Sequence, residues 1–485
     1  MEETRPLLHG QITLQSAIED DGNVLLELSY PENRIQFYTY LLLHRNEIES
    51  IVSFHLGLSG KQSCRLGEVK EWLSGSFNVC IPVYVGNWKE DTPRVLIRFP
   101  LPYKENCRSI PLPHLWGFGF ADGVSLTAIE TAPLISRLMW RFRWFVSSFL
   151  RKPLACRYFP YGAMLSETWD ELRHDETRRN NLFRGLSRII LSTTQCRFDR
   201  VGSLTINNQG FIRLTNRPLA LCLQHLENES IPTNIGREIT YAATDAYLSD
   251  LLECHNLRVR HAPNSIRDEF YGQAQLSALT IMRAILPHFT RRDLGHGPYV
   301  LSLTDLHQSN LFVDDDWNIK YLVDLEWTCS QPVEMLQPPY WLTSRGVDQL
   351  QKGEHLNAFS NMHTEFTDTL EDEEQLSLSN DPKVFDIATL MRKGWELGSF
   401  WYFHALENPK GLCNIFLDHI QRIFAQLDDQ GMIQFERTVA PYWTKDLSGF
   451  LAQKKKDKDL HDNQLWDTFL AARNRNSGRD FTFRY

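Results

Sequence analysis

The sequence lacks the features that define several common protein classes. Its nine cysteines are odd in number and include no C-x-x-C pair, which argues against a disulfide framework and against a zinc site. No run approaches the roughly 20 apolar residues of a membrane span, and the acidic start at residues 1–5 is not typical of a secretory signal. A net charge of -9 argues against general nucleic-acid binding, which needs a basic surface. We expect a cytoplasmic protein in a reducing compartment.

One segment carries a pattern that points to chemistry. Residues 303–310 read LTDLHQSN, and residues 323–327 read VDLEW after a short interval. A phosphotransfer loop needs a carboxylate to meet the attacking hydroxyl, and it needs an amide oxygen and a second carboxylate to hold Mg2+ on the phosphate oxygens. Asp305, Asn310 and Asp324 are spaced to fill these three roles.

The surrounding sequence predicts a setting for these residues. Residues 312–313 and 319–323 read as two strands joined by a turn at 314–318, so the hairpin would bring Asn310 and Asp324 together at its open end. The three aspartates of the turn are expected to be solvated. Residues 272–289 have the apolar spacing of a helix that could support the loop from beneath.

An alternative interpretation stays open for the motif. Asp and Asn are common in turns, so an isolated D-x-x-x-x-N pattern is more often a solvated loop than an active site. The second aspartate favours the functional interpretation, because Asp324 follows a strand and is itself followed by Glu326 and Trp327. A spacing match on its own would carry little weight.

The chain resembles the aminoglycoside phosphotransferase and choline kinase-like family, and within it the members found in filamentous fungi. The resemblance spans roughly residues 35–425 and is strongest after residue 164. Beyond the loop, it depends on the segments WLSGSFN at 72–78, VLIRFP at 95–100, MLSETW at 164–169, NRPL at 216–219 and PPYWL at 338–342. It implies an α+β, protein-kinase-like fold of two lobes with ATP in the cleft between them.

The resemblance also implies roles for single residues. Asp305 would be the catalytic base, and Asn310 and Asp324 would be the Mg2+ ligands. The H-G-D triplet of the family reads LTD at residues 303–305 here. The histidine that normally braces the loop is therefore absent, while His307 stands two residues after the aspartate.

The amino-terminal half would supply the phosphate contacts. By resemblance, Gly75 and Ser76 belong to the loop that covers the phosphates, and Arg98 stands where the family usually keeps a lysine. Residues 79–85 and 94–99 are predicted to form a hairpin whose inward positions could aim Arg98 at phosphate. Arginine can bind phosphate oxygens in a bidentate manner. The alternatives are a surface strand arginine and, for Gly75, an ordinary turn glycine.

The small lobe is short compared with the family. The family normally places a helix with a glutamate, the partner of the phosphate-binding lysine, where this chain has only residues 101–109 and Glu105 as the one acid. The strand that grips adenine is hard to find between residues 158 and 165. Either the lobe is reduced or coding sequence has been lost, and in both cases we expect weak ATP binding.

The chain then divides into four parts. Residues 1–34 are a polar leader, 35–160 the small lobe, 161–430 the helical large lobe, and 431–485 a solvated tail. With 485 residues and 42% hydrophobic content the chain can bury a core in each lobe.

Four further segments carry more local predictions. Residues 364–381 are expected to be a loop between helices, and residues 386–402 and 411–427 two amphipathic helices. The basic and aromatic residues 138–146 favour a packed internal helix over a membrane-surface helix.

Together these patterns favour an ATP- and Mg2+-dependent phosphotransferase that acts on a hydroxyl of a small molecule. The main alternative is a pseudokinase, a binding or scaffold module that keeps the large lobe but has a degraded ATP site. A protein kinase is disfavoured, because D-F-G and A-P-E signatures are absent and residues 324–326 read DLE. The acceptor and the oligomeric state cannot be read from the sequence.

Overall fold

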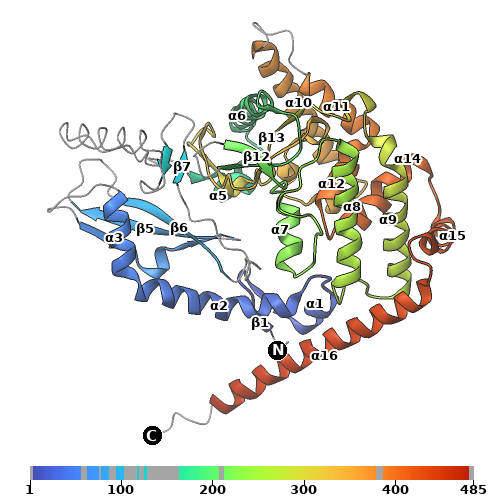
Figure 1. Cartoon of the computed structure of the whole chain (residues 1–485), viewed down its shortest axis with the longest axis horizontal. Coiled ribbons are helices and arrows are strands. Elements are labelled where there is room, and N and C mark those ends of the chain that lie inside the picture. Colours follow the sequence, from blue (N-terminus) through green and yellow to red (C-terminus); the bar gives the residue numbers. More distant parts are fainter. Residues whose placement is uncertain are drawn as a thin grey trace.

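Two hydrophobic cores of unequal size organise the chain (Figure 1). The computed structural model describes residues 4–55, 63–75, 78–86, 94–102, 117–119, 125–127, 163–206, 212–377 and 386–479. Over these residues the fold is α+β, mainly helical with small antiparallel sheets, as the sequence predicted. We call helices α2 and α3 with strands β3 to β6 the small unit, and the residues from 163 onward the large unit.

The small unit is an antiparallel sheet covered by two helices. Strand β5 is central, and its residues Val79, Ile81, Val83 and Val85 are almost completely buried because alternate side chains of a strand point to one face. Together the members of this unit bury a small core around that face. Its elements are α2 (Val24–Leu43), α3 (Arg45–His55), β3 (Ser63–Leu66), β4 (Leu73–Ser74), β5 (Asn78–Gly86) and β6 (Arg94–Pro100).

The predicted hairpin of the small unit is confirmed. Strands β5 and β6 pair antiparallel from Asn78 opposite Pro100 to Tyr84 opposite Arg94, with Cys80 opposite Arg98. The turn between them, at residues 87–93, lies outside the described residues. The short pair β7 (Gly117–Gly119) and β8 (Ser125–Thr127) follows it in the chain.

The large unit is built from helices around two three-stranded sheets and a separate hairpin. Its helices are α5 (Leu165–Leu172), α6 (Glu176–Thr194), α7 (Leu221–Asn228), α8 (Thr244–His261), α9 (Glu269–Phe289), α10 (Glu354–Ser377), α11 (Ile387–Leu397), α12 (Ser399–Glu407), α13 (Leu412–Ile415), α14 (Gln421–Phe424), α15 (Asp429–Val439) and α16 (Leu447–Arg479). They enclose the large core, which contains most of the largest buried side chains of the described chain.

The sheets of the large unit carry the predicted catalytic hairpin. One sheet has the order β10 (Arg197–Phe198), β13 (Tyr299–Leu303), β16 (Thr328–Pro332), and the other has β15 (Ile319–Leu322), β14 (Leu311–Val313), β9 (Ala163–Met164). The separate hairpin pairs β11 (Ser203–Ile206) with β12 (Ile212–Asn216). Leu311 pairs with Leu322, which confirms the hairpin that the sequence predicted between the strands flanking residues 314–318.

The predicted helix beneath the loop exists as α9, but it packs elsewhere. Asp268 caps its N-terminus by accepting from the backbone N–H of Tyr271 at 2.7 Å. The helix packs against α8 and α15 (Figure 1), whereas α5 packs against the loop at residues 308–310. The support of the catalytic loop therefore comes from α5.

The predicted loop at residues 364–381 is wrong over its described part, because α10 continues to Ser377. Phe359, Phe366 and Leu370 are fully buried and recur at spacings of one and two helical turns. They pack towards α6 and α11, so the acidic residues between them occupy the other faces of a helix. The helix predicted over 386–402 is interrupted at Gly398, whose φ of 82° ends α11 and starts α12.

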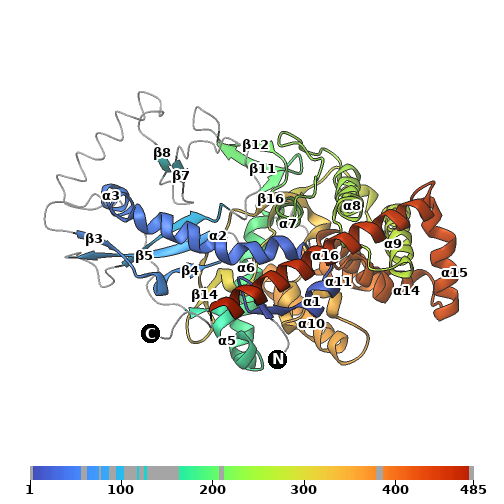
Figure 2. The ribbon, with the colours of Figure 1, turned by 90° about the horizontal axis from the view of Figure 1, so that it is seen from below.

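The two ends of the chain also differ from the predicted leader and tail. The first residues form β1 (Thr4–Pro6), β2 (Gln11–Thr13) and α1 (Leu14–Glu19), and α1 packs along α16 (Figure 2). Ala17, Val24, Leu465 and Phe469 bury a third, small cluster between them. The apolar positions of α16 are sparse among charges, so its buried side depends on a partner that is remote in the sequence.

Among the described residues, no helix combines the length and the apolar character needed to cross a membrane.

Candidate functional site

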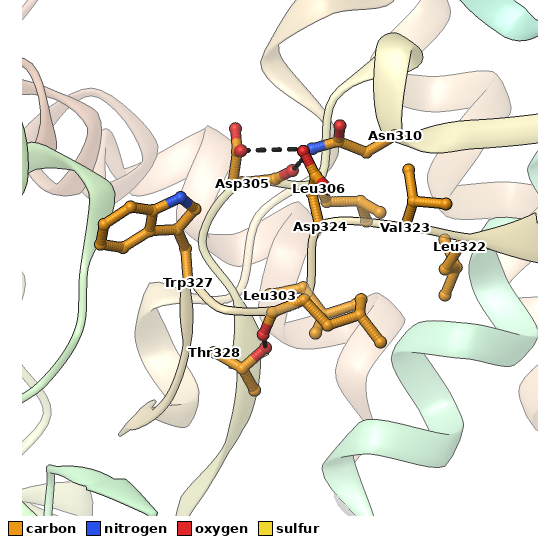
Figure 3. A pocket seen from close by; sticks show the side chains of 10 residues that line it. Leu303, Asp305, Leu306, Asn310, Leu322, Val323, Asp324, Trp327 and Thr328 are labelled. Atoms are coloured by element: carbon orange, nitrogen blue, oxygen red, sulfur yellow. Dashed lines mark hydrogen bonds between the residues drawn. The ribbon is translucent and has the colours of Figure 1, made fainter. Parts of the chain in front are cut away.

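The predicted catalytic loop is closed at its base by hydrogen bonds. Thr304 follows β13, and both its backbone N–H and its hydroxyl donate to the carbonyl of Trp327, at 3.0 and 2.8 Å. These bonds join the start of the loop to the chain that leaves Asp324. The loop then makes a tight turn in which the N–H of His307 donates to the carbonyl of Asp305 at 2.9 Å. Asp305 is thereby presented at the end of the hairpin (Figure 3).

Asn310 fixes Asp305 through its amide nitrogen. Nδ2 donates to the backbone oxygen of Asp305 at 2.8 Å and to its carboxylate Oδ2 at 3.2 Å. Asn310 is 8% exposed and sits at the end of a short 3-10 turn, Gln308–Asn310, that leads into β14. Since the nitrogen is used for Asp305, the amide oxygen is the atom that remains for another ligand.

Asp324 lies beside these two residues at the open end of the hairpin (Figure 3). The N–H of Val323 donates to the carbonyl of Asn310 at 3.0 Å, which holds the two strands together up to this point. Asp324 has a φ of 60°, a left-handed conformation that aspartate adopts more readily than most residues. The chain therefore turns sharply at Asp324, and its carboxylate gathers with the side chains of Asp305 and Asn310.

Arg98 reaches this group from the small unit. Its Nη1 lies 2.6 Å from Oδ1 of Asp324 and donates to Oε2 of Glu326 at 3.0 Å, while Nη2 pairs with Oε1 of Glu326. The side chain is 31% exposed, so it is partly shielded from water. Arg98 lies on a strand and stays partly exposed, as the surface-strand alternative has it, but its guanidinium connects β6 with the segment that carries Asp324 and Glu326.

Burial and neighbouring charges raise the pKa of Asp305 and of Asp324. Burial raises the pKa of Asp305 to about 6, the neighbouring carboxylates of Asp324 and Glu326 add to the rise, and the amide of Asn310 and the charge of Arg98 oppose it. Burial also raises the pKa of Asp324, against the opposing charge of Arg98. Both carboxyl groups are therefore less acidic than a free aspartate.

The space among these side chains is small. Asp305, Asn310 and Asp324 share a hollow with Trp327 and apolar neighbours (Figure 3). It offers about 10 Å³, which is about the room that one water molecule needs. Among the described residues, no set of three or more His, Cys, Asp or Glu side chains is placed to hold a metal ion. A cation here would depend on carboxylate and amide oxygens together.

The predicted phosphate loop is described only in part. The N–H of Gly75 donates to the carbonyl of Asn78 at 2.8 Å, which joins the end of β4 to the start of β5. A side chain at position 75 would meet this carbonyl at an ordinary contact distance of 3.6 Å, so this contact does not require glycine. Ser76 lies outside the described residues.

Several other predictions of the small lobe also fall outside the described residues. They concern Glu105, the interval 103–116, the segment 138–146 and most of the interval 158–165, in which the adenine-binding strand is hard to find and of which the structure describes residues 163–165. Among the described residues, the carboxylates that contact Arg98 are those of Asp324 and Glu326.

Three buried tryptophans pack beside the loop, and no sequence pattern indicated their contact. Trp169 of α5 stacks on Trp317 at 5.3 Å between ring centroids and meets Trp341 edge-on at 5.2 Å. The indole N–H of Trp341 donates to the carbonyl of Leu306 at 2.8 Å. Trp169 belongs to the MLSETW segment and Trp341 to the PPYWL segment. The sequence indicated both segments but did not predict that these two rings would meet.

His307 contributes to the loop by capping its short turn. Its Nδ1 accepts from the backbone N–H of Ser309 at 3.4 Å, and its ring lies 6.2 Å from Tyr340. Burial lowers the pKa of His307, which favours the neutral form. Asn310, Trp341 and His307 therefore each hold part of the loop.

Compared with protein-family models, with curated proteins and with solved structures, the chain has no match. Any functional assignment therefore depends on the geometry of this site and on the sequence motifs.

Proposed function

We propose that the chain is an ATP- and Mg2+-dependent phosphotransferase that acts on a hydroxyl of a small molecule, in a protein-kinase-like fold of two lobes. The observation that carries this proposal is the gathering of Asp305, Asn310 and Asp324 at one end of the hairpin, with the guanidinium of Arg98 beside them. The resemblance to the aminoglycoside phosphotransferase and choline kinase-like family supports the same assignment.

Asp305 is suited to act as the base. With a pKa of about 6, its carboxylate is mostly ionised at neutral pH and can accept the proton of an attacking hydroxyl. The two hydrogen bonds from Asn310 restrict its orientation. A base that is held in place before the acceptor arrives avoids part of the ordering cost of the reaction.

The donor set fits Mg2+. The carboxylate of Asp324 and the amide oxygen of Asn310 are hard oxygen ligands of the kind that Mg2+ prefers, with water and substrate phosphate completing its shell. When bound, Mg2+ would neutralise negative charge on the transferred phosphoryl group. Asp324 would have to give up its contact with Arg98 to serve as a ligand, and Arg98 would then be able to turn toward phosphate.

One observation favours the pseudokinase alternative. Arg98 is paired with Asp324, and the hollow between the acids has room for about one water molecule. A chain that stayed in this arrangement would bind neither Mg2+ nor the phosphates of ATP. It would then serve as a binding or scaffold module.

The test is the release of ADP from Mg-ATP in the presence of a panel of hydroxyl compounds, such as sugars, amino alcohols and aminoglycosides. We expect a Mg2+-dependent signal with at least one acceptor, and we expect Asp305→Asn to abolish it. Failure to bind Mg-ATP, together with no turnover on any acceptor, would favour the pseudokinase. A signal of equal size in Asp305→Asn would refute the assignment of the base.

A further inference from the structure

Glu326 holds the guanidinium of Arg98 by two nitrogens, whereas Asp324 holds it by one. The Oε2 of Glu326 accepts from Nη1 at 3.0 Å and its Oε1 accepts from Nη2, while Asp324 contacts Nη1 alone at 2.6 Å. A bidentate pair between arginine and carboxylate fixes the plane of the guanidinium, which a single contact does not. The orientation of Arg98 therefore depends on Glu326 more than on Asp324.

The same carboxylate is bonded to the sheet of the small unit. Asn78 is the first residue of β5, and its Nδ2 donates to Oε1 of Glu326 at 3.1 Å. Glu326 thus contacts both strands of the β5–β6 hairpin, at Asn78 and at Arg98. Because Glu326 comes from the large unit, two residues after Asp324, it links the catalytic segment to the hairpin that carries the cation.

The carboxylate of Asp324 cannot pair with a guanidinium and bind a divalent cation at the same time without a loss of affinity. An arginine charge at 2.6 Å would repel a cation bound to the same carboxylate. If Arg98 had Asp324 as its sole carboxylate, releasing Asp324 would leave the guanidinium unpaired in a half-buried place. With Glu326 present, the guanidinium keeps a carboxylate partner after Asp324 is released, since the two contacts between Glu326 and Arg98 do not involve Asp324.

We propose that Glu326 is the positioning carboxylate of Arg98, and that it allows Asp324 to exchange its arginine contact for a divalent cation. The inference rests on the proposed function, in which Asp324 is a metal ligand. The glutamate that the family resemblance places on a helix of the small lobe would here have its counterpart on the catalytic segment itself. Glu326 acts through Arg98 and is therefore a positioning residue.

The test is a double-mutant cycle in which Mn2+ binding to the full chain is measured by the loss of the free-ion signal in electron paramagnetic resonance. We expect Arg98→Met to tighten Mn2+ binding, because it frees Asp324. We expect Glu326→Gln to weaken binding about threefold to tenfold, because Arg98 then pairs with Asp324 alone. In the Arg98→Met background, Glu326→Gln should change the affinity by about twofold or less.

A matched control is available within the large unit. Glu373 also accepts from two nitrogens of one arginine, Arg188, at 2.7 and 3.1 Å. Glu373→Gln should leave Mn2+ affinity unchanged. Glu326 is 37% exposed, so its substitution should leave the fold intact, which circular dichroism can verify.

Two outcomes separate this inference from the proposed function. If Glu326→Gln weakens Mn2+ binding equally in both backgrounds, Glu326 acts only as a nearby negative charge and the positioning role is overturned, even if ATP turnover is found. If the wild-type chain fails to turn over ATP but the cycle shows coupling, the positioning role stands while the proposed phosphotransferase does not.

Discussion

Asp305, Asn310 and Asp324 of the candidate site belong to the large unit, while Arg98 belongs to the small unit. The loop that carries Asp305 and Asn310 packs beside three buried tryptophans, and backbone hydrogen bonds close its base. Arg98 stands on a four-stranded sheet whose core has nine buried residues. Local stability follows buried apolar contacts, so the acids should keep their geometry under conditions in which the arginine moves. The difference between the two cores leads us to expect that Arg98, rather than Asp305 or Asn310, changes its position in this site.

The largest expected effect concerns the acids. Asp305→Asn should lower any ATP turnover by about 10²- to 10⁴-fold, because it removes the base. The fold should persist and gain stability at neutral pH. The pKa of Asp305 is raised in the folded state, so its ionised form opposes folding above the unfolded pKa, and asparagine removes that cost. Turnover and urea denaturation, measured on the same samples, check both statements.

A control for this variant is Asp315→Asn, in the exposed turn of the catalytic hairpin. It removes the same charge at the opposite end of the same hairpin and should leave both turnover and stability within experimental error. Loss of turnover in Asp315→Asn would show that charge near the hairpin matters more than the position of the base.

The next largest effect compares one tryptophan from each core. Trp169 is fully buried among Trp317 and Trp341, and Trp169→Ala should lower the free energy of unfolding of the large unit by about 3–5 kcal/mol. Trp72 packs on Tyr38 at 4.9 Å in the small core. Trp72→Ala should affect an earlier, separate unfolding transition. A single transition shifted equally by both variants would show that the two cores unfold together.

The pH dependence should be set by the acids of the large unit. The value of kcat/KM should be nearly constant above pH 7 and fall by about tenfold between pH 7 and pH 5, because a base with a pKa of about 6 becomes protonated in that interval. Since the raised pKa is that of a carboxylate, activity is lost on acidification. A profile that stays flat down to pH 5 would place the base elsewhere.

The smallest effect concerns the brace beneath the loop. Trp341→Phe keeps an aromatic ring in the core but removes the hydrogen bond to the carbonyl of Leu306, with an expected cost of about 1 kcal/mol. If this bond positions Asp305, kcat should fall while the KM for ATP stays unchanged. The matched variant Trp317→Phe loses a bond to Thr168, outside the loop, and should leave kcat intact.

The sequence predicted the elements whose signals are local. The strand pattern and turn residues around 314–318 identified the hairpin of β14 and β15, and the expected pairing of residues 79–85 with 94–99 identified β5 and β6. The spacing of Asp305, Asn310 and Asp324 predicted one group of side chains, and the three residues line the same hollow because a hairpin and a short turn connect them. These contacts span few residues, so the sequence alone constrains them.

The remaining features depend on contacts between distant segments. Glu326 and Arg98 are 228 residues apart, and no periodicity can pair them. The tryptophan cluster joins α5, the hairpin turn and residue 341, and each ring alone reads as an ordinary apolar residue. Helix α16 looked like a solvated tail, since its buried residues pack against α1 and α9, which are remote from it in the sequence.

The most direct test of the proposed site is titration calorimetry of Mg-ATP against the wild-type chain, Asp324→Ala and Asp305→Asn. We predict Mg2+-dependent binding by the wild type, weaker than micromolar because Arg98 must first leave Asp324. Binding should be lost in Asp324→Ala and kept in Asp305→Asn, because the metal ligand holds the nucleotide whereas the base acts on the acceptor. Unchanged Mg-ATP affinity in Asp324→Ala would contradict the assignment of this site.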